Sequence, residues 1–286
     1  MVGEVTERIA VARSAGLPQD LKARVASGVV LAGLALAANW AGPLPFAILV
    51  GIVAVVMSWE WARVVRDGAF DSAMWAQFTV TTIAIAAATG RQPWLTVLVL
   101  AVGAIVVAAL TRVRRPLFSS LGVLYVCLPA IGLVWLRQDD AGGWLAVLFI
   151  YVVVWTTDTF AYTCGKLIGG PKLWPAVSPM KTWAGTIGGV CFAAVSGLVF
   201  AYIMSHPAPL SLALIGVVLS VAAQTGDLAE SALKRAFAVK HASLLIPGHG
   251  GFLDRMDGIV AAAAVAALLA ALRDPLMPAY ALLFWV

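Results

Sequence analysis

The sequence has few charged residues for its length. Its 286 residues include 19 lysines or arginines and 14 aspartates or glutamates, so 12% are charged, while 62% are hydrophobic. Soluble globular domains usually carry about 25% charged and about 45–50% apolar residues. So little charge cannot cover a surface that faces water on all sides, and a disordered chain would be polar rather than apolar. The composition therefore predicts an integral membrane protein.

Cysteine and histidine are also scarce, with three of each. Three cysteines do not build a disulfide framework, and neither residue type shows the spacing of a zinc site. The chain has no GxxxxGK[ST] phosphate loop and no G-x-S-x-G motif, which excludes a Walker-type nucleotide site and the usual serine hydrolase motif. Any chemistry must therefore come from other residues.

Long apolar runs, in contrast, fill most of the chain. A helix needs about 20 mostly apolar residues to cross the hydrocarbon layer, and scanning on that scale gives nine candidate spans. They are residues 26–41, 44–62, 73–89, 94–111, 117–136, 143–163, 184–204, 208–226 and 258–272. The sequence thus predicts an all-α polytopic membrane protein with about nine transmembrane helices.

The two ends of the chain are not expected to span. The first fifteen residues contain charges and no apolar core, which indicates a cytoplasmic tail or surface helix rather than a cleavable signal peptide. The final run at 278–286 is too short to cross the membrane, and we expect it to lie at an interface.

The basic residues indicate the orientation. Lysine and arginine are enriched in cytoplasmic loops, and nine spans that start from a cytoplasmic N-terminus place 16 of the 19 basic residues on that side. We therefore expect a cytoplasmic N-terminus and a C-terminus on the opposite side. Residues 1–140 are expected to form the tail and scaffold helices, and residues 141–286 a catalytic transmembrane region with cytoplasmic loops 155–183 and 224–257.

The later of these loops has a polar helix face. A spacing of i, i+3, i+4, i+7 and i+8 places five side chains on one side of a helix. They are Asp227, Glu230, Ser231, Lys234 and Arg235. A simple amphipathic helix with an intrahelical Glu230–Lys234 pair is the alternative, and such a pair contributes about 0.3–0.5 kcal/mol.

A glycine-rich stretch and two further carboxylates follow. Residues 247–251 read PGHGG, whose glycines permit positive φ and let backbone N–H groups approach an anion. Asp254 and Asp257 lie at the membrane boundary, where a carboxylate is a functional candidate, although Asp257 could also serve as a helix N-cap. Carboxylates, basic residues and a glycine loop at one depth are typical of a magnesium–polyphosphate site.

The earlier loop supplies further polar groups. Asp158 lies inside an apolar run beside three threonines, so it is either a buried carboxylate that hydroxyl groups satisfy or part of a polar site. Lys166 and Lys181 would attract anionic headgroups and nucleotides. Ser178 and Thr182 would add hydroxyl donors.

These motifs resemble a known family. The stretch from Ser231 to Asp257, SALKR-x4-K-x4-LIPGHGGFLDRMD, resembles the signature of phosphatidate cytidylyltransferases (CDP-diacylglycerol synthases), and Asp158 to Trp183 is similar to that family's second region. The resemblance implies the reaction of CTP with phosphatidate to give CDP-diacylglycerol and pyrophosphate, in phospholipid biosynthesis. It also implies Mg²⁺, with room for a second cation.

The resemblance assigns expected roles to individual residues. The metal ligands would be Asp227, Asp254 and, in support, Asp257. The catalytic set would be Asp227, Asp254, Lys234, Arg235, Arg255 and Lys181. The substrate-binding set would be Asp158, Lys166, Ser178, Thr182, Ser231, Lys240, His249, Gly250 and Gly251. Three positions depart from the family pattern: Met180 replaces a lysine, Ala184 a glutamate and His241 an aspartate.

The expected setting follows from the same resemblance. We expect a multi-pass protein of the inner (plasma) membrane with its site facing the cytoplasm, CTP and phosphatidate as substrates, no nucleic-acid partner, and a homodimer as one compatible assembly. Two alternatives stay open at this point. One is a related CTP-using lipid enzyme, either an ether-lipid cytidylyltransferase or a CTP-dependent lipid kinase, and the other is a transporter with an acidic relay through Asp158.

Overall fold

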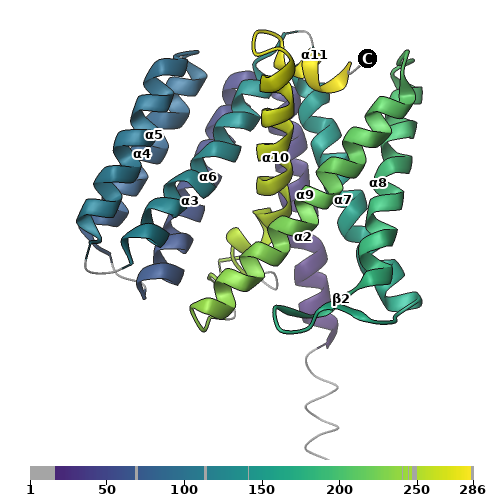
Figure 1. Cartoon of the computed structure of the whole chain (residues 1–286), viewed down its shortest axis with the longest axis horizontal. Coiled ribbons are helices and arrows are strands. Elements are labelled where there is room, and N and C mark those ends of the chain that lie inside the picture. The colour runs from purple at the N-terminus through teal and green to yellow at the C-terminus, as the bar shows by residue number, and fades with distance from the viewer. Residues whose placement is uncertain are drawn as a thin grey trace, which may run out of the picture.

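The computed structural model describes residues 17–67, 70–112, 115–140, 142–239, 241–243, 245–246 and 250–284. Within them the chain forms a bundle of helices with one β-hairpin (Figure 1). The long helices are α2 (Leu17–Ala41), α3 (Pro43–Arg66), α4 (Ser72–Thr89), α5 (Pro93–Leu110), α6 (Pro116–Arg137), α7 (Gly143–Leu167), α8 (Trp183–Ile203), α9 (Pro209–Ala236) and α10 (Leu253–Arg273). The short elements are β1 (Lys172–Trp174), β2 (Ser178–Thr182) and α11 (Pro278–Leu283).

Each predicted span corresponds to one of the helices α2 to α10. Seven helices of the described chain are long and apolar enough to cross a membrane, which confirms an all-α polytopic membrane protein. The two others are α4 and α2, whose apolar part is the shorter stretch Ala26–Ala41. A total of nine crossings therefore stays a prediction.

Proline and capping side chains set where helices begin. Five helices (α3, α5, α6, α9 and α11) have proline in their first two positions, where the missing N–H has no intrahelical partner to lose. Asp71 caps α4 by accepting the Met74 N–H at 2.8 Å. Thr182 caps α8 by accepting the Gly185 N–H at 3.1 Å.

Glycine lets three helices of the second half approach closely. A Cβ atom added at Gly185 of α8 would lie 2.5 Å from the carbonyl oxygen of Ala161 in α7, and one added at Gly197 would lie 2.5 Å from that of Leu212 in α9. Small residues at such contacts are the usual means of packing helices inside a membrane. The α7–α8–α9 layer is therefore tightly joined.

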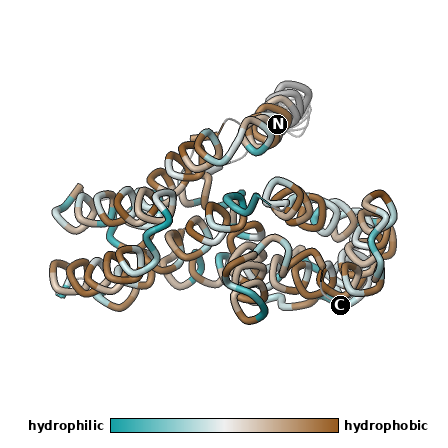
Figure 2. The backbone as a smooth tube through the Cα atoms, turned by 90° about the horizontal axis from the view of Figure 1, so that it is seen from above, coloured by the Kyte–Doolittle hydropathy of each residue, from teal (hydrophilic) through white to brown (hydrophobic). Residues whose placement is uncertain are grey.

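Helix α10 connects two parts of the apolar core. One core cluster joins α10 to α6, α7, α8, α9 and α11, and a second joins it to α3, α4 and α6. In Figure 1 this helix accordingly lies near the centre of the bundle. Seen from above, hydrophobic residues colour most of the length of the helices, as expected where lipid surrounds them (Figure 2).

The predicted cytoplasmic segments lie at one end of the bundle. The β-hairpin, the start of α2 and the connection from α9 to α10 are at the bottom of Figure 1, whereas α11 and the C-terminus are at the top. β1 and β2 pair antiparallel, with Lys172 opposite Thr182 and Trp174 opposite Ser178. This hairpin is the one strand structure of the described residues, and the sequence did not predict it.

Two predicted loops are shorter than expected, and the final run forms a short helix. Within segment 155–183 helix α7 continues to Leu167, and within segment 224–257 helix α9 continues to Ala236 while α10 begins at Leu253. Helix α11 has six residues, too few to span, and its residues Ala279, Ala281, Leu282 and Leu283 are buried against the end of the bundle; its place at the membrane interface stays a prediction.

Candidate active site

The polar face of α9 turns into the protein. Because the helix continues unbroken to Ala236, Asp227 and the four predicted residues after it lie on its last turns. Glu230 on that face is buried, whereas Ala229 and Ala236 on the apolar face are exposed. The i, i+3, i+4, i+7, i+8 spacing therefore predicted the helical face correctly, and Asp227 and Lys234 on it contact neighbouring elements.

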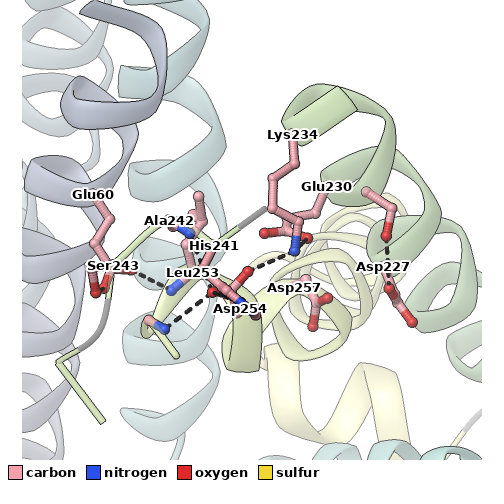
Figure 3. A network of polar contacts seen from close by, with 12 residues as sticks. Glu60, Asp227, Glu230, Lys234, His241, Ala242, Ser243, Leu253, Asp254 and Asp257 are labelled. Atoms are coloured by element: carbon pink, nitrogen blue, oxygen red, sulfur yellow. Dashed lines mark hydrogen bonds and ion pairs between the residues drawn. The ribbon is translucent and has the colours of Figure 1, made fainter. Parts of the chain in front are cut away.

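Lys234 joins two carboxylates of different helices. Its Nζ lies 2.5 Å from Oε2 of Glu230, one turn earlier in α9, and 2.6 Å from Oδ1 of Asp254 in the first turn of α10 (Figure 3). The predicted Glu230–Lys234 pair is thus present, but it is part of a three-residue cluster. Glu230 Oε1 is buried and has no hydrogen-bond partner among the described residues.

The second carboxylate oxygen of Asp254 accepts hydrogen bonds from the connection between α9 and α10. Oδ2 accepts the N–H groups of Gly251 at 3.1 Å and Ala242 at 3.3 Å. Gly250 has φ of 84°, and a Cβ there would lie 2.9 Å from the same oxygen. Positive φ in this stretch is therefore confirmed at Gly250. The anion that the Gly251 N–H approaches is a carboxylate of the protein itself.

The β-hairpin brings a second basic residue to α9. Lys181 Nζ in β2 lies 2.5 Å from Oδ2 of Asp227 and 3.4 Å from the carbonyl oxygen of Gln224. Oδ1 of Asp227 accepts the Ser231 hydroxyl at 3.4 Å. Residues from the two predicted loops therefore meet at one place.

Asp257 and Asp158 complete a group of acidic residues. Asp257 is near enough to Asp227, Glu230 and Asp158 to interact with them electrostatically. It lies inside α10 rather than at its N-cap, which is Phe252. Asp158 of α7 interacts electrostatically with Asp227, Lys181 and Arg255, which favours a part in a polar site over a carboxylate satisfied by hydroxyl groups alone.

The remaining predicted site residues have other contacts or positions. Lys166 lies on the last turn of α7 with its Nζ 5.8 Å from the Tyr162 ring centroid. Thr182 is buried and uses its hydroxyl as the cap of α8. Ser178 begins β2, and Arg235 and Arg255 are exposed. Lys240 and His249 lie outside the described residues.

Sequence reasoning missed a residue from the predicted scaffold. Glu60 of α3 is fully buried and accepts hydrogen bonds from the Ser243 hydroxyl and from the N–H groups of Phe252 and Leu253 (Figure 3). No local spacing could reveal it, because it is separated from these partners by at least 183 residues. The available signal was the glutamate itself, which lies inside an apolar run where a charge is costly.

A second missed residue is Tyr125 of α6. Its buried hydroxyl has no hydrogen-bond partner among the described residues, and the charges that act on it belong to Asp257, Glu230 and Asp227. Its ring packs on that of Trp61 in α3, with centroids 4.8 Å apart. The first half of the chain therefore forms one side of the acidic group.

The acidic group fits a cation with oxygen ligands. Five carboxylates (Asp158, Asp227, Glu230, Asp254 and Asp257) lie near one another, and Oε1 of Glu230 has no hydrogen-bond partner among the described residues. No three His, Cys, Asp or Glu side chains of the described chain are arranged to hold a metal ion by themselves. Mg²⁺ usually takes one or two carboxylates together with substrate phosphates, so this donor set suits a cation shared with a polyphosphate.

Of the three departures, His241 lies at the site. Its Nδ1 is 3.8 Å from Oδ2 of Asp254, so an ionisable nitrogen faces that carboxylate. Met180 is 82% exposed on the hairpin, and Ala184 lies in the first turn of α8. Neither contributes a charged group to the cluster.

Comparisons with known proteins point to one family. A family described as the cytidylyltransferase family matches residues 22–272. The phosphatidate cytidylyltransferase of Brucella suis biovar 1 (strain 1330) is 36% identical over 263 residues, which cover 91% of this chain and 97% of the relative. That of Bacillus subtilis (strain 168) is 33% identical over 253 residues, covering 84% and 94%. That of Staphylococcus saprophyticus (strain ATCC 15305) is 40% identical over 144 residues, covering 50% and 54%.

Proposed function

Because the chain belongs to the cytidylyltransferase family, we propose that it is a phosphatidate cytidylyltransferase. It transfers the cytidylyl group of CTP to phosphatidate, giving CDP-diacylglycerol and pyrophosphate. The observation that carries this proposal is the meeting of Lys181–Asp227 and Lys234–Asp254 at one end of the bundle, in a chain that matches the relatives over most of its length.

The reaction needs positioning and charge neutralisation more than acid–base chemistry. A phosphate oxygen of phosphatidate attacks the α-phosphorus of CTP, and the bond from that phosphorus to the β-phosphate oxygen breaks, so pyrophosphate leaves. The attacking phosphate is already an anion, so no residue has to remove a proton from it. The main barrier lies in bringing two polyanions together and stabilising charge at the α-phosphate.

The basic residues of the site would neutralise these phosphates. Lys181 and Lys234 are each held against an aspartate, and the arriving phosphates would compete for the same ammonium groups. Arg235 and Arg255 are exposed, and each would offer charge-assisted hydrogen bonds to a phosphate oxygen. Asp158 and the hairpin would border the nucleotide.

Asp227, Asp254 and Asp257 would hold Mg²⁺ together with phosphate oxygens. The support is the oxygen-only donor set and the unpartnered Oε1 of Glu230 described above. When bound, the cation would neutralise charge on the leaving pyrophosphate. Lys181 and Lys234 would then be released from their aspartates toward the substrates.

We also propose the finer topology. The nine helices α2 to α10 would all cross the membrane, with the hairpin end of the bundle in the cytoplasm and α11 on the opposite face of the inner membrane. This assignment is supported by the strong bias of basic residues to one side. A homodimer is the proposed assembly, and the mass of the purified protein in a nanodisc tests it.

The experiment that tests the function uses the full-length protein in detergent with labelled CTP, phosphatidate and Mg²⁺. Replacing phosphatidate with diacylglycerol or a polyprenol distinguishes the alternatives, because a CTP-dependent kinase would give CDP and a phosphorylated lipid. Formation of CDP-lipid and pyrophosphate with phosphatidate, but with neither of the other two lipids, supports the proposal. Formation of CDP instead contradicts it.

A further inference from the structure

Glu60 lies near the C-terminal end of α3, and its carboxylate has no exposed surface. Burial of a charged group is costly unless hydrogen bonds replace its hydration. Three donors do so here. Oε1 accepts the Ser243 hydroxyl at 2.5 Å and the Phe252 N–H at 3.0 Å, while Oε2 accepts the Leu253 N–H at 2.6 Å (Figure 3).

Two of these donors, the N–H groups of Phe252 and Leu253, are ones that the start of α10 leaves unpaired. The first N–H groups of a helix have no intrahelical acceptor, and the N-cap residue Phe252 has no side-chain capping bond. Glu60 supplies the acceptor from another helix, with a charge that suits a helix N-terminus. Gly251 makes room, because a Cβ there would lie 2.6 Å from Oε1 and 2.9 Å from Oε2 of Glu60.

The residues just before α10 are also bonded to Asp254. Its Oδ2 accepts the Gly251 N–H, and it also accepts the N–H of Ala242, the neighbour of Ser243. The stretch from Gly251 to Leu253 is thus bonded to Glu60 on one side and to Asp254 on the other. A shift of this stretch would displace the Asp254 carboxylate and the Lys234 ammonium bonded to it.

We propose that Glu60 is a positioning residue for the cytidylyl transfer: it fixes the start of α10 and the segment before it, so that Asp254 and Lys234 stand in their working geometry. The inference rests on the proposed function of this site. It assigns a role in the reaction to a residue in the part of the chain that the sequence predicted as scaffold.

The first test is Glu60→Gln, which keeps the shape but turns one acceptor into a donor. Every partner of Glu60 donates to it, so the new amide NH₂ must face an N–H group of Phe252 or Leu253. Because misplacement by about 1 Å can cost about 100-fold in rate, we expect kcat per folded enzyme to fall by that order, with a smaller change in KM for CTP. Hydrogen exchange of a peptide covering residues 250–256 should become faster, whether or not the enzyme turns over.

The second test uses reciprocal rescue. Gly251→Ala adds a methyl group against Glu60, and Glu60→Asp withdraws the carboxylate by one methylene, so each should lower kcat alone. The double variant gives the methyl group the space that aspartate vacates, and we expect it to be more active than Gly251→Ala. If Gly251 mattered only through contact with substrate, shortening Glu60 would restore nothing, and that result would overturn the proposal.

Ser58→Ala is the matched control. Ser58 is also buried in α3, but its hydroxyl is hydrogen-bonded to that of Thr81 in α4 at 3.1 Å. We expect a lower melting temperature with unchanged kcat per folded enzyme. Equal kcat in Glu60→Gln and Ser58→Ala, with unchanged exchange at 250–256, would refute a positioning role.

Two further measurements cover a variant that does not fold and a wild-type protein that is inactive. If Glu60→Gln does not yield folded protein, Ser243→Ala removes one of the three bonds and should lower kcat about fivefold, the equivalent of one hydrogen bond; an unchanged kcat overturns the proposal. A wild-type protein that makes no CDP-lipid refutes the proposed function, whereas the exchange measurement still reports whether Glu60 holds the start of α10.

Discussion

The ammonium nitrogen of Lys234 lies 2.6 Å from Oδ1 of Asp254, across a sequence separation of 20 residues. This contact joins the end of α9 to the beginning of α10 where both helices reach the predicted cytoplasmic side. It brings together the two halves of the motif that carried the family resemblance, and Glu230 is bonded to the same nitrogen.

The two lysine–aspartate contacts should respond differently to mutation. Lys234 faces Glu230 and Asp254, whose side chains are 1% and 5% exposed, so Lys234→Gln leaves two buried carboxylates without their cation. We expect it to lose activity and to lower the free energy of unfolding by about 3–5 kcal/mol. Activity assays and thermal denaturation in detergent measure the two effects.

Lys181→Gln should lower activity with little effect on stability. The Lys181–Asp227 pair is more open, with side chains 22% and 40% exposed, and such pairs contribute about 0–1 kcal/mol. We expect the loss as a higher KM for CTP. A stability loss as large as that of Lys234→Gln would show that the hairpin contact is structural.

Asp227→Asn and Asp254→Asn should each lower kcat by about 100- to 1,000-fold, the usual loss of an electrostatic group at the reacting centre. Asp274→Asn is the control, since Asp274 follows the opposite end of α10 and accepts the nearby N–H groups of Leu276 and Met277. Steady-state turnover of monodisperse protein measures the effect. Near-normal rates in both site variants would remove these aspartates from the reaction.

The close contact of α8 with α9 should not tolerate a larger residue. Gly197→Leu places a side chain where even a Cβ would lie 2.5 Å from the Leu212 carbonyl oxygen, whereas Gly33 has no atom within 4 Å of an added Cβ. We therefore expect a marked loss of melting temperature for Gly197→Leu and little change for Gly33→Ala. Similar melting temperatures for both would contradict the packing of α8 on α9.

Cysteine labelling tests the proposed orientation. In a variant lacking Cys127, Cys164 and Cys191, Leu276→Cys (Leu276 is 90% exposed) should react with a membrane-impermeant maleimide in intact spheroplasts. Met180→Cys on the hairpin (Met180 is 82% exposed) should react only after permeabilisation. The reverse pattern would invert the topology.

Most of the fold could be predicted because membrane spans depend on local composition. The predicted span 143–163 and helix α7 differ at the end, where α7 continues past residue 163 to Leu167. Polar residues in segment 155–183 suggested a loop. The helix continues because polar side chains do not interrupt the backbone hydrogen bonds within α7. The hairpin was missed because β1 and β2 together contain only eight residues and pair through backbone groups that carry no sequence pattern.

The site was predictable where it follows helical spacing. The five polar residues from Asp227 to Arg235 share one face because they lie on the single helix α9. Asp254 lies beside them because α10 begins after a short connection. Glu60 and Tyr125 were not predictable, because their positions depend on how α3 and α6 pack against α10. Tertiary packing of that kind leaves no periodic signal in a single sequence.

The most direct test of the central claim is product analysis with the full-length purified protein, CTP, phosphatidate and Mg²⁺. The account predicts equal amounts of CDP-diacylglycerol and pyrophosphate, with both lost in Asp254→Asn and retained in Asp274→Asn. Absence of CDP-diacylglycerol, in an assay where the Bacillus subtilis relative forms it, would contradict the account.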